Sequence, residues 1–205
     1  MTSVPGRRTQ AERRTATRSA LVRATVDCLV ELGYARTTTQ EVQSRAGVSR
    51  GALTHHFTTK ADLVLAAADH IYAEFSESVR KAAAELPDDP VARIRLGIEL
   101  IWERFDGPPF VASMELWTAA RTDPELRAAL LPHERRLGAQ LRELSVEVFG
   151  EQVARHPASE AVSQVLLTAM RGQALTYALQ PDAPRGGPHL QHWLAIVDAF
   201  TPAGP

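Results

Sequence analysis

The side chains best able to do chemistry lie close together near the amino terminus, and their chemistry suits binding to an anion. Residues 38–60 carry hydroxyl, imidazole, guanidinium and ammonium groups, separated by short apolar stretches. These polar residues are Thr38, Ser49, Arg50, Thr54, His55, His56 and Lys60. An arginine such as Arg50 can form the paired contact that discriminates guanine. Backbone amides at helix starts attract anions, and Lys60 adds a full charge beside such a start.

Metal binding and catalysis are poorly supported by the same residues. Adjacent helical residues point about 100° apart, so His55 and His56 are not placed to bind the same metal ion. The nearby sequence offers no third metal ligand. Cys28 is the only cysteine, which excludes an internal disulfide, and its helical spacing predicts a buried apolar role. The sequence has no nucleophile elbow, phosphate loop or HExxH motif. We therefore expect no cofactor, no metal and no enzymatic activity.

Charge is distributed unevenly along the 205 residues. The chain carries a net charge of -1, yet residues 1–60 hold ten Lys or Arg and four acidic residues, for a formal charge of +6. The remaining 145 residues carry -7. This asymmetry is typical of a phosphate-facing module attached to an acidic body.

Helical periodicity dominates the chain and predicts an all-α fold of about nine helices. The first helix covers about residues 9–32 and ends at Gly33. A capping box from Thr38 to Glu41 starts the second, Gly47 stops it, and Ser49 caps a third over about 50–57. Two short helices joined by a turn at Gly47 predict a helix-turn-helix, whose second helix enters the major groove of DNA.

Longer helices follow, separated by proline- and glycine-rich breaks. Their expected ranges are 59–86, 91–105, 110–121, 124–148, 159–179 and 189–200, with a surface loop at 181–188. We expect an N-terminal helix-turn-helix domain over residues 1–58, of which 1–8 form a disordered tail, and a C-terminal helical bundle over residues 59–205. The N-terminal arginines Arg7, Arg8, Arg13 and Arg14 are either solvated or reach the backbone or the minor groove of DNA. No apolar run is long enough to cross a membrane and no signal peptide is present, so we expect a cytoplasmic protein.

The stretch from Thr37 to Leu63 resembles the N-terminal domain of the TetR family of regulators, a homeodomain-like three-helix module. The matching residues, within a resemblance over about residues 10–70, are Thr37, Thr38, Val42, Ala46, Gly47, Val48, Ser49, Gly51, Leu53, His56, Phe57, Lys60 and Leu63. Thr54 departs from the family, which usually has tyrosine there, and Gln43 stands where alanine is preferred. These departures leave the docking mode intact and alter the sequence preference.

The resemblance also implies roles for individual residues. Thr38, Thr54, His56 and Lys60 fall at phosphate contacts, whereas Ser49, Arg50, Gly51 and His55 fall where base edges can be reached. The family encloses a ligand pocket in its helical body, and the bulky candidates here are Ile71, Phe75, Trp102, Phe105, Phe110, Met114, Trp117, Met170 and Tyr177. Dimerisation through the last two helices would use Leu166, Tyr177, Leu190, Trp193, Leu194, Val197 and Phe200.

These observations predict a DNA-binding transcriptional regulator, a repressor that a small apolar or amphipathic molecule releases from a palindromic operator. Its expected partners are double-stranded DNA, the small-molecule effector and a second copy of the chain in a homodimer. We expect no binding to a membrane. An activator or a ligand-independent regulator of the same fold is the alternative, because the sequence does not encode the sign of control. A helical enzyme and a helical adaptor that only dimerises are more distant alternatives.

Overall fold

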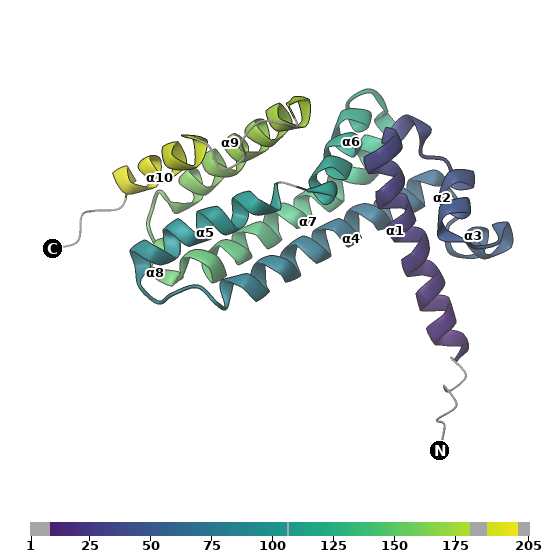
Figure 1. The fold of residues 1–205 in the computed structure, drawn as a ribbon, viewed down its shortest axis with the longest axis horizontal. Helices are drawn as coiled ribbons and strands as arrows, with labels where there is room; N and C mark the ends of the chain where they lie inside the picture. Colours follow the sequence, from purple (N-terminus) through teal and green to yellow (C-terminus); the bar gives the residue numbers. More distant parts are fainter. Residues whose placement is uncertain (1–8, 106, 181–187, 201–205) are drawn as a thin grey trace, which may run out of the picture. The chain divides into compact units, whose positions relative to one another are not determined.

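A computed structural model describes residues 9–105, 107–180 and 188–200, and the side chains of residues 152, 188 and 197–200 lie outside the description. The expected tail at 1–8, with Arg7 and Arg8, also lies outside it, as do residues 181–187 of the expected loop. The described residues form the helices α1 (Gln10–Arg36), α2 (Thr39–Ala46), α3 (Arg50–His56), α4 (Lys60–Ala83), α5 (Pro90–Arg104), α6 (Pro108–Thr122), α7 (Pro124–Phe149), α8 (Glu151–Ala154), α9 (Ser159–Leu179) and α10 (Pro188–Phe200) (Figure 1). The all-α prediction is confirmed.

Local side-chain chemistry accounts for where several helices begin. Thr9 forms a complete capping box with Glu12, and Asp89 accepts a hydrogen bond from the amide of Ala92 with Pro90 at the first turn of α5. The single turn of α8 follows Gly150, whose φ is +83°. Periodicity did not predict α8, because four residues are too few to establish a helical repeat.

The chain packs as two compact units. Unit one comprises the described residues up to Ile71 together with Val111–His133, and unit two comprises Tyr72–Phe110 together with the described residues from Glu134 onward. Both α4 and α7 therefore contribute to both units. The sequence-based boundary at residue 58 separates the DNA-binding helices from the remainder, whereas the packed units divide within α4.

The core of unit one joins the first four helices. Its buried side chains are Leu21, Val22, Ala24, Cys28, Val42, Leu53, Phe57, Leu63 and Ala66. Cys28 is completely buried, and this burial raises the pKa of its thiol. The predicted role of Cys28 as a buried apolar residue is confirmed. Burial of these side chains fixes α2 and α3 against α1 and the start of α4.

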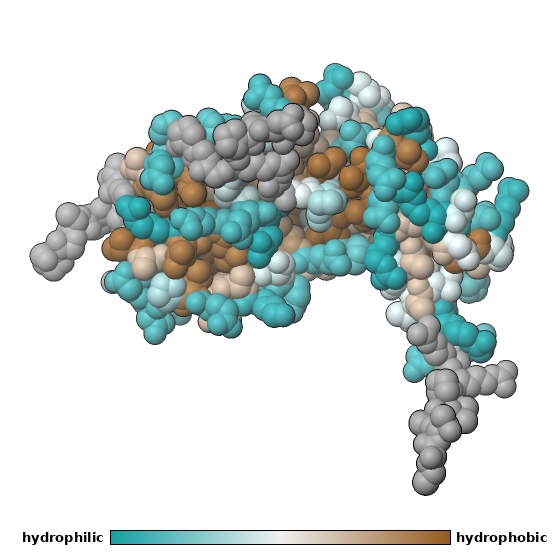
Figure 2. All heavy atoms as spheres, viewed as in Figure 1, coloured by the Kyte–Doolittle hydropathy of each residue, from teal (hydrophilic) through white to brown (hydrophobic). Residues whose placement is uncertain are grey.

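Unit two has a core of its own. Val79, Ala83, Leu100, Leu144 and Val148 are buried together, where α4, α5 and α7 meet. Several of its apolar side chains stay exposed, among them Val91 and Leu96 on α5, and brown patches mark apolar residues on the face drawn in Figure 2. Among the described helices, none combines the length and the apolar character that a membrane crossing requires.

Candidate nucleic-acid interface

Three local features define the helices of the helix-turn-helix: two side chains that cap helix starts and one glycine that ends a helix. The Thr38 hydroxyl accepts a hydrogen bond from the amide of Glu41 at 3.1 Å, and the Ser49 hydroxyl accepts one from the amide of Ala52 at 3.2 Å. Between the two helices Gly47 has a φ of +65° and a ψ of +31°, in the left-handed region that favours glycine. The predicted end of α2 at Gly47 and the predicted start of α3 at Ser49 are thus confirmed. Thr38 starts α2 as predicted, but only its half of the predicted capping box forms, because the Glu41 carboxylate pairs with Arg45.

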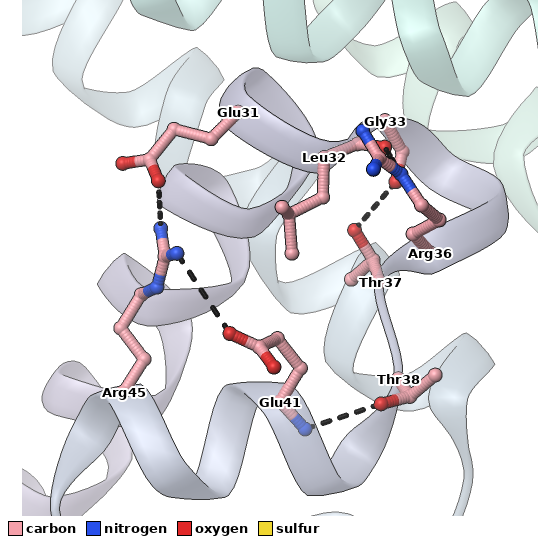
Figure 3. Close-up of polar contacts among 8 residues, drawn as sticks. All are labelled: Glu31, Leu32, Gly33, Arg36, Thr37, Thr38, Glu41 and Arg45. Atoms are coloured by element: carbon pink, nitrogen blue, oxygen red, sulfur yellow. Dashed lines mark hydrogen bonds and ion pairs between the residues drawn. The ribbon is translucent and has the colours of Figure 1, made fainter.

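A network of ion pairs holds α2 to the end of α1. Arg45 pairs with Glu31 at 2.9 Å and with Glu41 at 3.8 Å, and these pairs raise the pKa of its guanidinium, with the Glu31 hydrogen bond as the largest cause (Figure 3). At the same corner the buried Thr37 donates its hydroxyl to the carbonyl of Gly33 at 2.9 Å. The Glu31–Arg45 pair joins residues distant in sequence, which explains why local pattern did not reveal it.

One face of α3 is exposed and carries the predicted base-reading residues. Arg50, Gly51, Thr54 and His55 are all exposed, whereas Leu53 and Phe57 are buried in the core of unit one. Ser49, at the N-cap, is also exposed. Within the part of the chain that the structure describes, the Arg50 guanidinium has no ion pair. It can therefore reach an external acceptor without breaking an internal bond.

Positive side chains of α1 surround the end of α3. The Arg18 guanidinium lies 5.3 Å from the centre of the Phe57 ring, and Arg14 lies one turn earlier on α1. Partial burial lowers the pKa of His56, and His55, Arg14 and Arg18 lower it further through their positive charges. Sequence reasoning missed Arg18, although its spacing of four from Arg14 places both on one side of a helix.

The Lys60 side chain turns inward toward the end of α1. Its ammonium donates to the carbonyl of Tyr34 at 2.6 Å and lies 3.8 Å from the centre of the Tyr34 ring. Burial lowers the pKa of Lys60, while Asp123 opposes the shift, and burial also raises the pKa of the Tyr34 phenol. A phosphate contact by this ammonium, which the family resemblance implies, would have to replace the bond to Tyr34.

Glu115 of α6 binds the backbone of Tyr34 as well. Its carboxylate accepts a hydrogen bond from the amide of Tyr34 at 3.0 Å. Gly33, immediately before, has a φ of +76°, and a β-carbon there would lie 2.9 Å from the Glu115 Oε2 atom. The amide and the carbonyl of Tyr34 are thus bound by two different helices, α6 and α4.

Unit two contains a cavity of about 330 Å³ with mostly apolar walls. Of the predicted pocket residues, Phe75 and Met170 line it, together with Val79, Ile98, Leu137, Leu141, Val148, Phe149, Leu166 and Leu167. Its polar lining includes Glu134, Arg142, Ser163, Gln164 and Arg171. The other predicted pocket residues lie elsewhere: Trp102 contacts the rings of Tyr177 and Trp193, Phe105 contacts Phe110, and Ile71, Met114 and Trp117 belong to unit one.

Most of the predicted dimer residues on α9 and α10 are buried by contacts within the single chain. Leu166, Tyr177, Trp193 and Leu194 are buried within the single chain, and Leu190 is half-buried. The side chains of Val197 and Phe200 lie outside the described residues. The same two helices instead expose Val165 by 57%, Leu175 by 50%, Leu179 by 80% and Ile196 by 37%.

Comparison with known proteins decides the family. Residues 21–67 match the family described as bacterial regulatory proteins, tetR family. The HTH-type transcriptional regulator CymR of Pseudomonas putida is 34% identical over 182 residues, which cover 88% of this chain and 89% of CymR. The chain belongs to the TetR family. The similarity thus extends well beyond the helix-turn-helix motif that first indicated it.

Solved structures with a similar fold are also known. A crystal structure of a putative transcriptional regulator from Pseudomonas aeruginosa PAO1 superposes with a TM-score of 0.73 at 23% identity, covering 94% of this chain and 92% of that one. The multidrug binding protein EbrR, crystallised with imidazole, gives a TM-score of 0.60 at 21% identity, covering 92% and 96%. The chain is a DNA-binding transcriptional regulator of the helix-turn-helix type.

Proposed function

We propose that this TetR-family regulator acts in the cytoplasm as a homodimeric repressor, which releases a palindromic operator when a small molecule binds in unit two. The cavity in unit two is the observation that carries the sensing part of the proposal. Ligand sites are typically concave and mostly apolar with a few polar groups, and this cavity has that composition. EbrR, of similar fold, was crystallised with imidazole. The proposed ligand is apolar or amphipathic.

The proposed DNA contacts follow from the exposed face of α3. Arg50, Gly51 and His55 read base edges with Ser49 beside them, and Thr38 and His56 contact phosphates. Lys60 contacts phosphate only in a state in which its ammonium leaves the Tyr34 carbonyl. A twofold dimer presents two copies of α3 to half-sites about one helical turn apart, which is why the operator is palindromic.

Coupling between ligand and DNA is proposed to run through α4. This helix begins at Lys60 in unit one and contributes Phe75 and Val79 to the cavity in unit two. A ligand that changes the position of α4 at the cavity therefore acts on the helix that carries Lys60. Release of the operator requires that the ligand bind the DNA-free state more tightly than the DNA-bound state.

The test begins with selection of bound sequences from a random duplex pool, followed by operator affinity with and without a panel of small apolar and amphipathic molecules. Leu141→Trp fills the cavity, and Leu131→Trp is the matched control, since Leu131 is an exposed residue of the same helix. We expect an active molecule to release the operator from the unmodified protein and from the Leu131→Trp protein, but not from the Leu141→Trp protein. A panel that leaves every affinity unchanged, or a Leu141→Trp protein that responds normally, contradicts the sensing proposal.

Operator binding is expected to strengthen as the pH falls, because of His56. Its pKa is lowered in the free protein by burial, then by His55, Arg14 and Arg18, and a DNA phosphate beside it would raise that pKa. Binding then takes up protons, so affinity rises as the pH falls through the pKa of the complex and levels off below the pKa of the free protein. The gain is at most about tenfold per pH unit for each half-site.

The pH dependence is measured as operator affinity at constant ionic strength for the unmodified protein, His56→Gln and His156→Gln. His156 is an exposed histidine of unit two and serves as the control. We expect His56→Gln to flatten the pH dependence and His156→Gln to leave it unchanged. A His56→Gln protein with the full original slope would mean that another group, such as His55, takes up the proton.

The proposed dimer interface uses the exposed apolar side chains of α9 and α10. Val165, Leu175 and Leu179 lie at steps of ten and four along α9, which places them on one helical face, and Ile196 is exposed on α10. A charge introduced there would be desolvated on association. We expect Leu175→Glu to raise the dimer dissociation constant at least tenfold in sedimentation equilibrium, and Leu96→Glu, an equally apolar exposed site on α5, to leave it unchanged. Equal effects of the two changes would place the interface elsewhere.

A further inference from the structure

The helices that enclose the cavity in unit two differ in polarity. Among the described residues that line it, those of α4 and α5 are all apolar: Phe75, Val79, Ile98 and Ile101. The polar side chains of the lining belong to α7 and α9, the two helices joined through the single turn of α8. A molecule that fills this cavity therefore needs an apolar body for α4 and α5 and a polar group for α7 and α9.

Three of the polar side chains carry hydrogen-bond donors that the protein itself does not use. Within the described part of the chain, the Arg142 guanidinium, the Ser163 hydroxyl and the Gln164 amide have no hydrogen-bond or ion-pair partner. Ser145 differs, because its hydroxyl donates to the Arg142 carbonyl at 2.7 Å. A β-carbon on Gly138 would lie 3.9 Å from Nη1 of Arg142, so the guanidinium lies back over this earlier turn of α7. Gly138 lines the cavity as well.

The acidic side chains of the lining already have roles within the chain. Two arginines and two glutamates line the cavity, so formal charge alone favours neither sign of ligand. Glu134 accepts a hydrogen bond from the Tyr72 hydroxyl of α4. Glu160 lies in the first turn of α9, where a negative charge stabilises the helix start. Arg142 has no matching role, since it lies well before the last turn of α7, where a positive charge would stabilise the helix end.

We infer that the cavity takes a small organic anion with one carboxylate, which Arg142, Ser163 and Gln164 bind while its apolar body contacts α4 and α5. This inference rests on the proposed function and names the class of its effector. A carboxylate has about four acceptor positions, and paired guanidinium N–H groups, one hydroxyl and one amide supply donors for them. The volume of about 330 Å³ lies near the lower end of the range for ligand pockets, so the body is a single ring or a short chain.

The first test varies only the polar group of the ligand. Binding to the full-length protein at neutral pH is measured by calorimetry for hexanoate, hexanamide and hexylamine, and for benzoate, benzamide and benzylamine. We expect each acid to bind at least about tenfold more tightly than its amide, because its bonds are charge-assisted, and the amines to bind most weakly. Acetate, which lacks the apolar body, should not bind.

The outcomes separate this inference from the proposed function. An amide or an amine that binds as tightly as its acid overturns the inference, and so does a failure of both acids to bind. Either result leaves the proposed function standing, because its panel of effectors also contains neutral and cationic molecules. A panel in which no molecule affects the operator overturns the sensing proposal instead.

Arg142→Gln tests the main charged contact, with Arg135→Gln as its control. Arg135 is an exposed arginine of the same helix that does not belong to the described lining. We expect Arg142→Gln to weaken binding of the acids by about tenfold to a hundredfold, to leave the amides unchanged, and to be matched in neither effect by Arg135→Gln. Arg142→Lys should be intermediate, since it keeps the charge and loses the paired geometry. Equal losses for acid and amide would indicate a damaged cavity and would overturn the inference.

Gln164→Glu tests the same site by adding a charge to its other helix. A carboxylate there repels the carboxylate of an acid and attracts an ammonium, so the affinity ratio of benzoate to benzylamine should fall by about tenfold or more. Ala161→Glu adds the same charge to α9 at an exposed position that is not in the described lining, and should leave the ratio unchanged. A ratio that is unchanged in Gln164→Glu, or that falls equally in both variants, overturns the inference.

Discussion

An Arg50→Ala variant is expected to bind its selected operator about 2–6 kcal/mol more weakly than the unmodified protein, from about 1–3 kcal/mol for each of two half-sites. Arg50 lies at the first position of α3, exposed and without an ion pair among the described residues. Its guanidinium can therefore form a bidentate contact with a guanine without losing an internal partner. The measurement is the dissociation constant of the selected operator at one fixed salt concentration, since such affinities depend strongly on salt.

Three comparisons separate base reading by Arg50 from simple attraction to phosphate. Arg50→Lys keeps the charge and loses the paired geometry, so it should lose most of the affinity and the preference for guanine. Arg127→Ala removes an exposed arginine outside the helix-turn-helix and should have little effect. If Arg50 contacts only phosphate, Arg50→Ala weakens random duplex and operator equally and reduces the salt slope by about one for each contact.

The helix-turn-helix was predictable because its determinants are local. Thr38 and Ser49 each cap a helix through an amide three residues away, and Gly47 ends α2 through its own backbone conformation. Bonds of this range are encoded in the order of residue types and need no knowledge of the tertiary fold. The exposed and buried faces of α3 then follow from helical periodicity.

The environment of Lys60 was not predictable for the opposite reason. Its partner, the Tyr34 carbonyl, is 26 residues away, and the Glu115 carboxylate that binds the Tyr34 amide is 81 residues away from it. A sequence pattern shows that Lys60 carries a charge beside a helix start. It does not show that the ammonium is turned inward over an aromatic ring.

The body of the protein shows a second limit, which concerns helices that are apolar on more than one side. In α9 both the buried pair Leu166 and Tyr177 and the exposed trio Val165, Leu175 and Leu179 follow helical spacing. Periodicity identifies both sets as apolar faces, but packing alone determines which one the chain buries. The same ambiguity applies to the cavity, where Phe75 and Met170 line the wall while Trp102 packs against other aromatic rings.

The second large effect is expected from Gly33→Ala, which should lower the free energy of unfolding by about 2–6 kcal/mol. Gly33 has a φ of +76° and a ψ of 167°, a conformation almost confined to glycine, which costs a residue with a β-carbon about 1–3 kcal/mol. The new atom would also displace the Glu115 carboxylate, 2.9 Å away, and leave the Tyr34 amide without that acceptor, at a further cost of about 1–3 kcal/mol. Denaturant unfolding at a fixed protein concentration measures the change.

A matched glycine and a double-mutant cycle test this explanation. Gly138→Ala places a methyl within α7 in ordinary contact, 3.9 Å from the nearest Arg142 atom, and should leave stability unchanged or raise it by about 0.5–1 kcal/mol. Glu115→Ala removes both the clash and the hydrogen bond, so Gly33→Ala should cost less in that background, with the backbone strain remaining. If Gly33→Ala costs as much in the Glu115→Ala background as in the unmodified protein, backbone strain alone sets the requirement for glycine. A cost that nearly vanishes in that background would instead show that the carboxylate, rather than the positive φ, excludes a side chain from the end of α1.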